Sequence, residues 1–298
     1  MTADAVRAAA PAWAVRDGVL VLDRPRLLGI VNVTPDSFSD GGNFFVRDAA
    51  VAHAERLAAE GADVLDVGGE STRPQGAEAV SEAEELGRVI PVVRELVRRL
   101  PQVPVSVDTV KAVVADAALA EGARIVNDVS GGRLDPRMAA VCARHGAGFV
   151  IMHSRGTVRD MATYTYAEYD DVVGDVLTEL ERRAAAARAA GVAAEAIVFD
   201  PGIGFSKRSA QSLAVLAGIP RLRAAGYPIL VGASRKRFIG ELTGVDVAAE
   251  RVAGTVGAHV AALMLGARLF RVHDVRPARQ SLDVAWAVLA AGAGPGPA

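Results

Sequence analysis

Eight repeats of one pattern constrain the fold of this 298-residue chain more than any other feature. Each repeat opens with a short apolar run, turns abruptly to a polar or glycine-rich loop, and continues into a stretch with helical periodicity. The apolar runs are residues 27–33, 63–67, 105–107, 124–126, 148–152, 196–199, 228–231 and 268–270. Strands that alternate with helices in this way call for parallel pairing and right-handed crossovers. We therefore expect an α/β fold, a (β/α)8 TIM barrel.

An open, doubly wound parallel sheet is the alternative that the same alternation allows. Its dinucleotide-binding form carries G-x-G-x-x-G where the first strand meets the first helix. No such motif opens the first predicted helix of this chain, so the barrel is favoured.

Three segments follow from this assignment. Residues 1–26 are predicted to form an N-terminal tail and a β-hairpin, because Asp17-Gly18, a strong turn pair, separates two short apolar runs. Such a hairpin could plug the bottom of a barrel. Residues 27–290 are predicted to form the barrel itself. Residues 291–298 are rich in Gly and Pro and are predicted to be a disordered tail.

Charge, cysteine content and hydropathy argue against several classes of protein. The formal net charge is −2 and there is no basic tract, so we expect no nucleic-acid partner. Cys142 is the only cysteine, which leaves no disulfide framework and no thiolate metal site. No apolar run reaches the length of a membrane span, and no basic segment followed by an apolar core opens the chain. We therefore expect a cytoplasmic protein with no membrane partner.

The loops that follow the apolar runs carry most of the side chains capable of chemistry. In a (β/α)8 barrel the carboxyl ends of all strands meet on one face, where active sites lie. The strand ends of this chain deliver Asn32, Thr72, Arg73, Asp108, Asn127, His153, Asp200, Lys236, Arg271 and His273. The opposite ends offer mostly Ala, Gly and Pro. This asymmetry predicts an active site.

Asp108, Asn127 and Asp200 follow the third, fourth and sixth strands. Two carboxylates and a carboxamide that point inward can bind a flat heterocycle with alternating donors and acceptors, such as a guanidine-like ring edge. The alternative for either aspartate alone is an N-cap of the following helix, because Asp is common there. Their occurrence together, with Asn127 between them, favours a ligand site.

A second group of side chains near the strand ends is cationic: Arg73, Lys236, Arg271 and His273. The loops after the seventh and eighth strands form the usual phosphate site of this fold. Backbone N–H groups of Ser234 and Arg235 could add to such a site where a helix begins. The alternative for Lys236 and Arg271 is a pair of surface charges, but both lie at strand ends.

Asn32, Asp36 and Asp40 offer oxygen atoms after the first strand. Mg²⁺ prefers a few protein oxygens together with phosphate oxygens, so these residues suit Mg²⁺. Other histidines fall on predicted helices and are expected to be structural: His53, His145 and His259. His153 either lines the site or packs beneath it. Cys142 is expected to be a small core residue, and the loop from Tyr164 to Tyr166 is either a lid or a simple connection.

Seven segments resemble the signatures of the dihydropteroate synthase family of folate biosynthesis. In order along the chain they read GIVNVTPDSFSDGG, DVGGESTRP, SVDT, NDVSGG, DPGIGFSK, GASRKRFIG and RVHDV. The resemblance covers residues 27–290, and seven segments in the family's order are far more specific than any one of them. It implies a transferase that condenses 6-hydroxymethyl-7,8-dihydropterin diphosphate with p-aminobenzoate, and a homodimer formed through the later helices.

The resemblance also implies a role for each matched residue. The pterin would be held by Asp108, Asn127, Asp200, Lys236 and Arg271. The diphosphate would be bound by Asn32, Arg271 and His273, with Mg²⁺ on Asn32. The p-aminobenzoate pocket would be formed by Thr72, Arg73, Pro74, Phe205, Ser234 and Lys236. The catalytic residues would be Asp108, Lys236, Arg73 and Asp36, the last two on loops that close over the reacting centre.

In the mechanism that the resemblance implies, pyrophosphate leaves first and the aryl amine traps a pterin cation. Mg²⁺, Arg and His would neutralise the growing charge of the leaving group, and the buried carboxylate of Asp108 would stabilise the cation. The aryl amine is already nucleophilic near neutral pH, so no activated side-chain nucleophile is required. None is evident in the sequence.

One departure from the family pattern concerns the loop after the second strand. The family usually reads Thr-Arg-Pro-Gly, whereas Gln75 separates Pro74 from Gly76 here. This change reshapes the loop beside the p-aminobenzoate pocket and bears on sulfonamide-like analogues more than on the reaction. Two other functions stay open. A pterin-dependent methyltransferase would keep the pterin residues but would not need the diphosphate cations, and a non-catalytic pterin-binding paralogue should have lost a loop or a charge.

Overall fold

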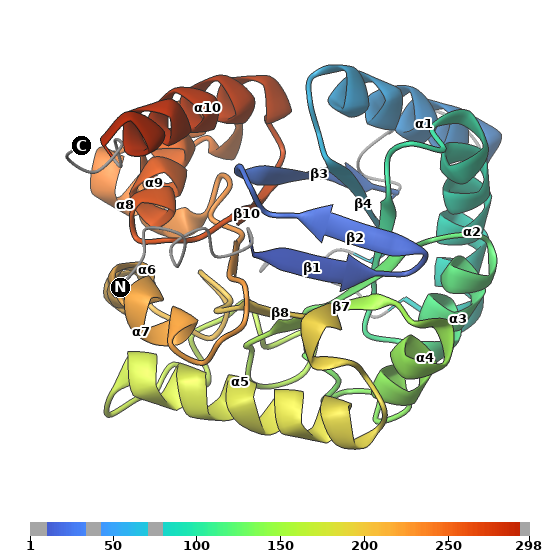
Figure 1. The fold of residues 1–298 in the computed structure, drawn as a ribbon, viewed down its shortest axis with the longest axis horizontal. Helices are drawn as coiled ribbons and strands as arrows, with labels where there is room; N and C mark the ends of the chain where they lie inside the picture. The colour runs from blue at the N-terminus through green and yellow to red at the C-terminus, as the bar shows by residue number, and fades with distance from the viewer. Residues whose placement is uncertain (1–10, 34–42, 71–79, 293–298) are drawn as a thin grey trace, which may run out of the picture.

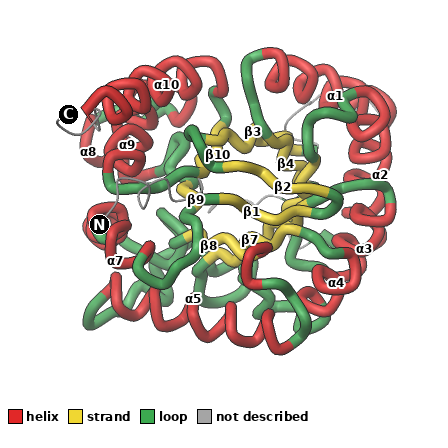
Figure 2. The backbone as a smooth tube through the Cα atoms, in the orientation of Figure 1, coloured by secondary structure: helices red, strands yellow, loops and turns green. Residues whose placement is uncertain are grey.

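The computed structural model describes residues 11–33, 43–70 and 80–292 and confirms the predicted (β/α)8 barrel with its N-terminal hairpin. The parallel barrel strands in these ranges are β3 (Arg26–Asn32), β4 (Val64–Gly68), β5 (Val105–Asp108), β6 (Ile125–Asp128), β7 (Gly148–Met152), β8 (Ile197–Asp200), β9 (Leu230–Val231) and β10 (Leu269–Val272). Each strand lies beside the next one in sequence, and β10 returns to pair with β3. A parallel bridge between Phe199 and Ile229 closes the ring between β8 and β9 (Figure 2).

Helices surround the barrel on its outer side (Figure 1). They are α1 (Asn43–Ala59), α2 (Glu82–Arg99), α3 (Ala112–Ala120), α4 (Met138–His145), α5 (Val172–Ala189), α6 (Ser209–Ala217), α7 (Ile219–Arg223), α8 (Arg237–Thr243), α9 (Val252–Met264) and α10 (Val275–Gly292). Outward-facing strand residues such as Val31 pack against helical residues such as Leu57 in the largest core. Burial of this apolar surface on both faces explains why the strands read as continuous apolar runs.

Two helical regions are interrupted. α6 and α7 are divided at Gly218, where Pro220 stands in the first turn of the second helix. α8 is a separate short helix before α9, which begins at Val252. Seven residues are too few to establish a helical period in the sequence.

The hairpin plugs the bottom of the barrel, as predicted. β1 (Ala12–Val15) and β2 (Gly18–Val21) pair antiparallel across the barrel in Figure 1. Trp13 is fully buried, and its indole N–H donates to the carbonyl of Ala196 at 2.8 Å. The hairpin packs against the lowest inward-facing layer of the barrel, which is Leu28, Val64, Ile125, Val150, Val198, Leu230 and Leu269.

Two residues further along the strands, the inward-facing layer becomes polar. Side chains alternate between the two faces of a strand, so positions two apart point to the same side. Of the seven residues two positions beyond the apolar layer, four are polar: Asp66, Asn127, Asp200 and Arg271. The polar layer therefore lies at the carboxyl ends of the strands, on the side away from the hairpin.

The two ends of the chain lie mostly outside the described residues. α10 continues to Gly292, and the rest of the predicted tail, 293–298, is not described. Within the described ranges, no helix is both long and apolar enough to cross a membrane. The division of the chain at residues 26 and 290 stays a prediction.

Candidate active site

The barrel brings together most of the side chains that the sequence singled out. The following lie at or beside the carboxyl ends of strands: Asn32, Asp108, Asn127, Asp200, Lys236, Arg271 and His273. The other predicted site residues on the first two loops lie outside the described residues: Asp36, Asp40, Thr72, Arg73, Pro74 and Gln75. The described part of the site is thus built from β3, β5, β6, β8, β10 and the segment before α8.

An ion-pair network crosses the barrel between β4, β5 and β10. The guanidinium of Arg271 donates from Nε to Oδ2 of Asp66 at 2.6 Å and from Nη2 to Oδ2 of Asp108 at 2.7 Å. The side chain of Asn127 donates from Nδ2 to the same Oδ2 of Asp66 at 3.0 Å. Arg271 lies within β10 rather than after it, so its side chain points into the barrel and not to the surface. The surface-charge alternative for Arg271 is therefore wrong.

Both predicted carboxylates of the site have raised pKa values. Burial raises the pKa of Asp108 to about 7; Arg271 opposes this shift, and the carboxylates of Asp66 and Glu85 add to it. Burial likewise raises the pKa of Asp200 to about 6, against the hydrogen bond from Gly202 and the charge of Lys236. Carboxylates held in this way accept N–H donors strongly once they are ionised.

The helix-cap alternative for the two aspartates is wrong. The residue before α3 is Lys111, and the side chain that accepts the first N–H of this helix, at Ala112, is that of Asp135 and not Asp108. Oδ1 of Asp200 accepts the backbone N–H of Gly202 at 2.7 Å, and α6 begins only at Ser209. Neither carboxylate is used at a helix start, so both remain available to a ligand.

Lys236 and Phe205 lie face to face beside Asp200. Nζ of Lys236 is 3.8 Å from the centre of the Phe205 ring, a cation–π contact. The glycine at position 204 allows this approach, because a Cβ there would lie 3.2 Å from Cδ of Lys236. Burial and the charge of Arg271 lower the pKa of Lys236 to about 8. Lys236 is therefore a half-buried ammonium within the site, and the surface-charge alternative is wrong for it too.

Ser234 and His273 form a hydrogen-bonded pair after β9 and β10. Oγ of Ser234 lies 2.9 Å from Nδ1 of His273 and accepts the backbone N–H of His273 at 3.2 Å. The neighbouring Arg235 has a φ of 58° and donates its backbone N–H to Oγ1 of Thr255 at 2.9 Å. The expectation that this N–H meets a phosphate is therefore wrong, because it is already bonded within the protein.

Of the three residues predicted to suit Mg²⁺, Asn32 is the one that the structure describes. It lies at the end of β3 and lines a hollow of about 530 Å³ together with Arg235, His273 and Asp274. No group of three or more His, Cys, Asp or Glu side chains in the described ranges could hold a metal by itself. A single amide oxygen fits Mg²⁺, which keeps most of its coordination sphere for water and substrate phosphate oxygens.

His153 packs beneath the site and does not line it. It is fully buried, its Nδ1 lies 2.8 Å from Nζ of Lys207, and its Nε2 lies 3.3 Å from a carboxylate oxygen of Glu179. Burial and the charge of Lys207 lower the pKa of His153 to about 3. The tyrosine loop lies over α8, where the ring of Tyr164 faces the guanidinium of Arg237 at 4.0 Å.

The remaining sequence expectations concern structural residues. Cys142 is buried in the core, as expected. The helical histidines have contacts within the fold: His53 with the carbonyl of Ile30, His145 with Asp116, and His259 with the ring of Phe270.

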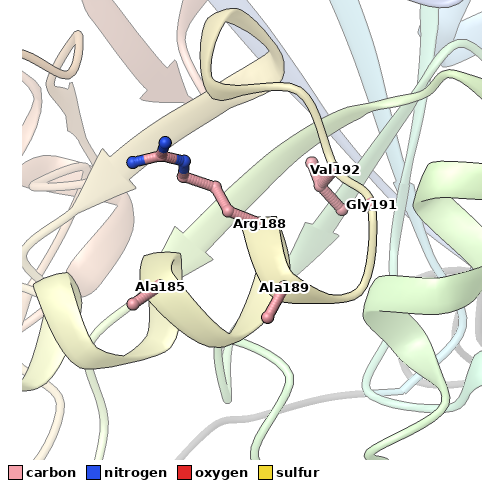
Figure 3. A pocket seen from close by; sticks show the side chains of 5 residues that line it. All are labelled: Ala185, Arg188, Ala189, Gly191 and Val192. Carbon is pink, nitrogen blue, oxygen red and sulfur yellow. The ribbon is translucent and has the colours of Figure 1, made fainter.

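A separate hollow of about 480 Å³ lies where α5 ends, at the amino-terminal side of the barrel (Figure 3). Among the described residues that line this hollow, Arg188 is the charged one. The hollow lies at the opposite end of the barrel from the strand ends that carry the site.

Sequence reasoning missed Asp66 and Lys207. Asp66 stands between Leu65 and Val67 in a strand that is buried on both faces. A carboxylate in such a run is costly unless it is paired, so its position was the available signal. Lys207 closes the DPGIGFSK segment and has an exposed fraction of only 1%, which no local pattern indicates.

Comparison with known protein families gives one match over most of the chain. The model of the family described as "Pterin binding enzyme" matches residues 28–273. This range holds all barrel strands of the described residues except the first two residues of β3, and it holds every predicted site residue.

Individual relatives agree with the family match. The dihydropteroate synthase of Mycobacterium leprae is 47% identical over 272 residues, which is 90% of this chain and 94% of the relative. A structure of Xanthomonas albilineans dihydropteroate synthase with 4-aminobenzoic acid is 48% identical, with a TM-score of 0.86, and covers 95% of this chain and 100% of its own. A structure of the same enzyme in complex with 7,8-dihydropteroate is 46% identical, with a TM-score of 0.82, over 94% and 100% of the two chains.

Proposed function

The chain belongs to the pterin-binding enzyme family, and from this membership we infer that it works as a dihydropteroate synthase. It condenses 6-hydroxymethyl-7,8-dihydropterin diphosphate with p-aminobenzoate and yields 7,8-dihydropteroate and pyrophosphate. The observation that carries this conclusion is the similarity, over nearly the whole chain, to enzymes whose structures hold 4-aminobenzoic acid and 7,8-dihydropteroate. The methyltransferase and the non-catalytic paralogue find no support among the relatives.

We propose that the pterin lies over the polar layer of the barrel. Its amino and ring N–H groups would donate to Asp108 and Asp200, and Asn127 would supply an amide to the same edge. Lys236 would donate to a ring acceptor, and Arg271 would flank the ring. The buried, low-dielectric setting of these groups supports this assignment, because hydrogen bonds to charged partners are strongest there.

The diphosphate is assigned to the open side of this layer. Asn32, Arg271 and His273 would bind it, and the hydrogen bond between Ser234 and His273 fixes the orientation of the imidazole. Asn32 would hold Mg²⁺ through its amide oxygen. Bound there, Mg²⁺ would supply a Lewis acid that neutralises charge on the leaving phosphate oxygens.

The p-aminobenzoate is assigned to the space beside Lys236. Phe205 offers an apolar ring face, Lys236 offers a positive charge to the carboxylate, and Ser234 offers a hydroxyl at the edge. The other predicted contacts, Thr72, Arg73 and Pro74, belong to the loop outside the described residues, as does the catalytic assignment of Asp36 and Arg73.

The reaction needs charge stabilisation more than proton transfer. The C–O bond to the diphosphate breaks with its electron pair leaving on pyrophosphate, and cations such as Arg271 and His273 stabilise that charge. The carboxylate of Asp108 stabilises the pterin cation that is left. The amine nitrogen of p-aminobenzoate then forms the new C–N bond and loses a proton.

We also propose a homodimer and a cytoplasmic location, as the resemblance implies. Support for the dimer comes from α9 and α10, which pack on each other and expose apolar side chains. Met264, Val284 and Val288 have exposed fractions of 54%, 67% and 63%. Equilibrium sedimentation tests the dimer directly.

The first test is turnover of dihydropterin diphosphate with p-aminobenzoate and Mg²⁺, followed through both dihydropteroate and pyrophosphate. Equal amounts of the two products are expected. Pterin binding without either product would favour the non-catalytic paralogue and overturn the assignment. A reaction without added p-aminobenzoate is the control for simple hydrolysis.

A further inference from the structure

Asp66 is a fully buried carboxylate in the middle of β4, at the centre of the site. Its Oδ2 accepts two hydrogen bonds, one from Nε of Arg271 at 2.6 Å and one from Nδ2 of Asn127 at 3.0 Å. Its Oδ1 is buried and has no hydrogen-bond partner among the described residues. One oxygen atom of Asp66 therefore joins two of the residues assigned to the pterin.

A carboxylate in this position does not serve the stability of the barrel core. The flanking residues Leu65 and Val67 are fully buried, and Val64 belongs to the apolar layer beneath. Burying a carboxylate costs free energy, and an apolar residue in place of a buried ion pair is often neutral or stabilising. The presence of a carboxylate at this position points to an effect on its two partners.

Arg271 bridges the carboxylates of Asp66 and Asp108. While its Nε is held by Asp66, its Nη2 donates to Oδ2 of Asp108 at 2.7 Å. A substrate edge with two adjacent donors would engage both oxygens of Asp108 and would compete there with the bond from Nη2. While that bond is open, Asp66 still holds the guanidinium of Arg271 by a hydrogen bond.

We propose that Asp66 is a positioning residue of the pterin site. It holds Arg271 and Asn127 in place while Asp108 gives up its hydrogen bond from Arg271 and accepts the N–H donors of the pterin. This inference rests on the proposed function. Asp66 acts through its two partners and touches no substrate in this scheme. Both contacts use Oδ2, so the proposed role does not require a partner for Oδ1, and Oδ1 has none among the described residues.

The first experiment compares Asp66→Asn with Ser106→Ala in the full-length chain. Ser106 is the neighbour of Asp66 across the β4–β5 pairing and is equally buried, and its Oγ has no hydrogen-bond partner among the described residues. S106A therefore changes a buried polar side chain at the same level of the barrel without removing a hydrogen bond of Arg271 or Asn127. D66N is expected to raise KM for the dihydropterin diphosphate by about tenfold or more while KM for p-aminobenzoate stays within about twofold. S106A is expected to match the wild type in both. Equal rises in the two KM values, or none, would overturn the proposal.

The second experiment tests whether Asp66 acts through Arg271. Binding of the dihydropterin diphosphate is measured by calorimetry in D66N, in Arg271→Met and in the double variant. If the residues act together, D66N weakens binding much less in the Arg271→Met background than in the wild type. Equal weakening in both backgrounds would overturn the proposal.

A third experiment covers the case in which D66N does not fold. Asp66→Ala leaves space for formate, whose carboxylate can replace the one removed. Recovery of the low KM with formate supports the proposal, and a folded but unrescued variant counts against it. Loss of the fold in both variants would assign Asp66 to stability and overturn the proposal. Failure of the proposed function is seen separately, because the wild type and S106A would then show no turnover.

Discussion

Nζ of Lys207 lies 2.8 Å from Nδ1 of His153, and both side chains are fully buried beneath the ends of β7 and β8. The ammonium also donates to the carbonyls of Gly202 and Phe205 at 3.2 and 3.1 Å. Burial lowers the pKa of Lys207 to about 7, and in its protonated form the lysine donates to Nδ1 of a neutral His153, whose own pKa is lowered to about 3. The cluster fixes the shape of the loop that carries Asp200 and Phe205.

Lys207→Met is expected to loosen this loop. The methionine preserves most of the buried volume but leaves the carbonyl of Phe205 and an imidazole nitrogen without the donor they have now, at about 1–3 kcal/mol for each unsatisfied group. We expect a clear fall in melting temperature and a rise in KM for p-aminobenzoate, because Phe205 is displaced. Thermal unfolding and initial-rate kinetics measure the two effects.

Arg208→Ala is the matched control, because Arg208 is the next residue and is exposed. It should leave both quantities nearly unchanged. A methionine variant as stable and active as the wild type would show that the cluster around Lys207 does not shape the loop.

Trp13→Ala is expected to destabilise the barrel without harming the site. Trp13 is fully buried against the lowest layer of the barrel, and large-to-small changes of this kind cost about 3–5 kcal/mol. We expect a marked loss of stability in urea, while kcat below the transition stays near the wild-type value. Val19→Ala is the control, since Val19 lies in the same hairpin and has an exposed fraction of 61%. An equal loss of stability in the two variants would contradict the role of the hairpin as a plug.

The strand ends could be predicted because their chemistry is local. Each apolar run ends at a polar residue, and in a barrel the carboxyl ends of all strands lie on one face. Asp108, Asn127 and Asp200 were placed correctly on this argument alone. The hairpin over the barrel bottom followed in the same way from one Asp-Gly turn between apolar runs.

The contacts within the site could not be predicted, because they depend on distances between remote residues. Arg271 is 205 residues from Asp66 and 163 from Asp108 in the sequence, yet it pairs with both. The direction of its guanidinium follows from its place inside β10, one residue beyond the predicted strand end. Lys207 and His153 were likewise separated by 54 residues and give no joint signal.

Asp108→Asn and Lys236→Ala are each expected to cut turnover severely while the fold stays intact. The asparagine keeps the size of Asp108 but cannot stabilise a cation, and the alanine removes the ammonium beside Phe205. Loss of one such electrostatic group reduces kcat by about 10²–10³-fold. Steady-state kinetics, with circular dichroism as the check on folding, measure this. Near-normal rates in both variants would refute the site assignment.

The pH dependence of kcat/KM for the dihydropterin diphosphate should be bell-shaped. Asp108 accepts N–H donors only when ionised, and its pKa is raised to about 7, so activity should rise with pH through that value. Lys236 donates only when protonated, and its pKa is lowered to about 8, so activity should fall above that value. Among the described residues, five charged groups interact with Asp108 through their charge: Arg271 on β10, Asp66 on β4, Glu85 on α2, Asp128 on β6 and Lys236 before α8.

Lys236→Arg separates these groups from the titration of the substrate diphosphate. Arginine keeps its proton throughout the accessible range, so the alkaline limb should disappear in this variant while the acid limb stays in place. The substrate titrates identically with both proteins, so any difference between the two profiles belongs to residue 236. An alkaline limb that persists unchanged in Lys236→Arg would assign it to another group. Lys236 would then remain a contact for p-aminobenzoate whose protonation does not limit the rate.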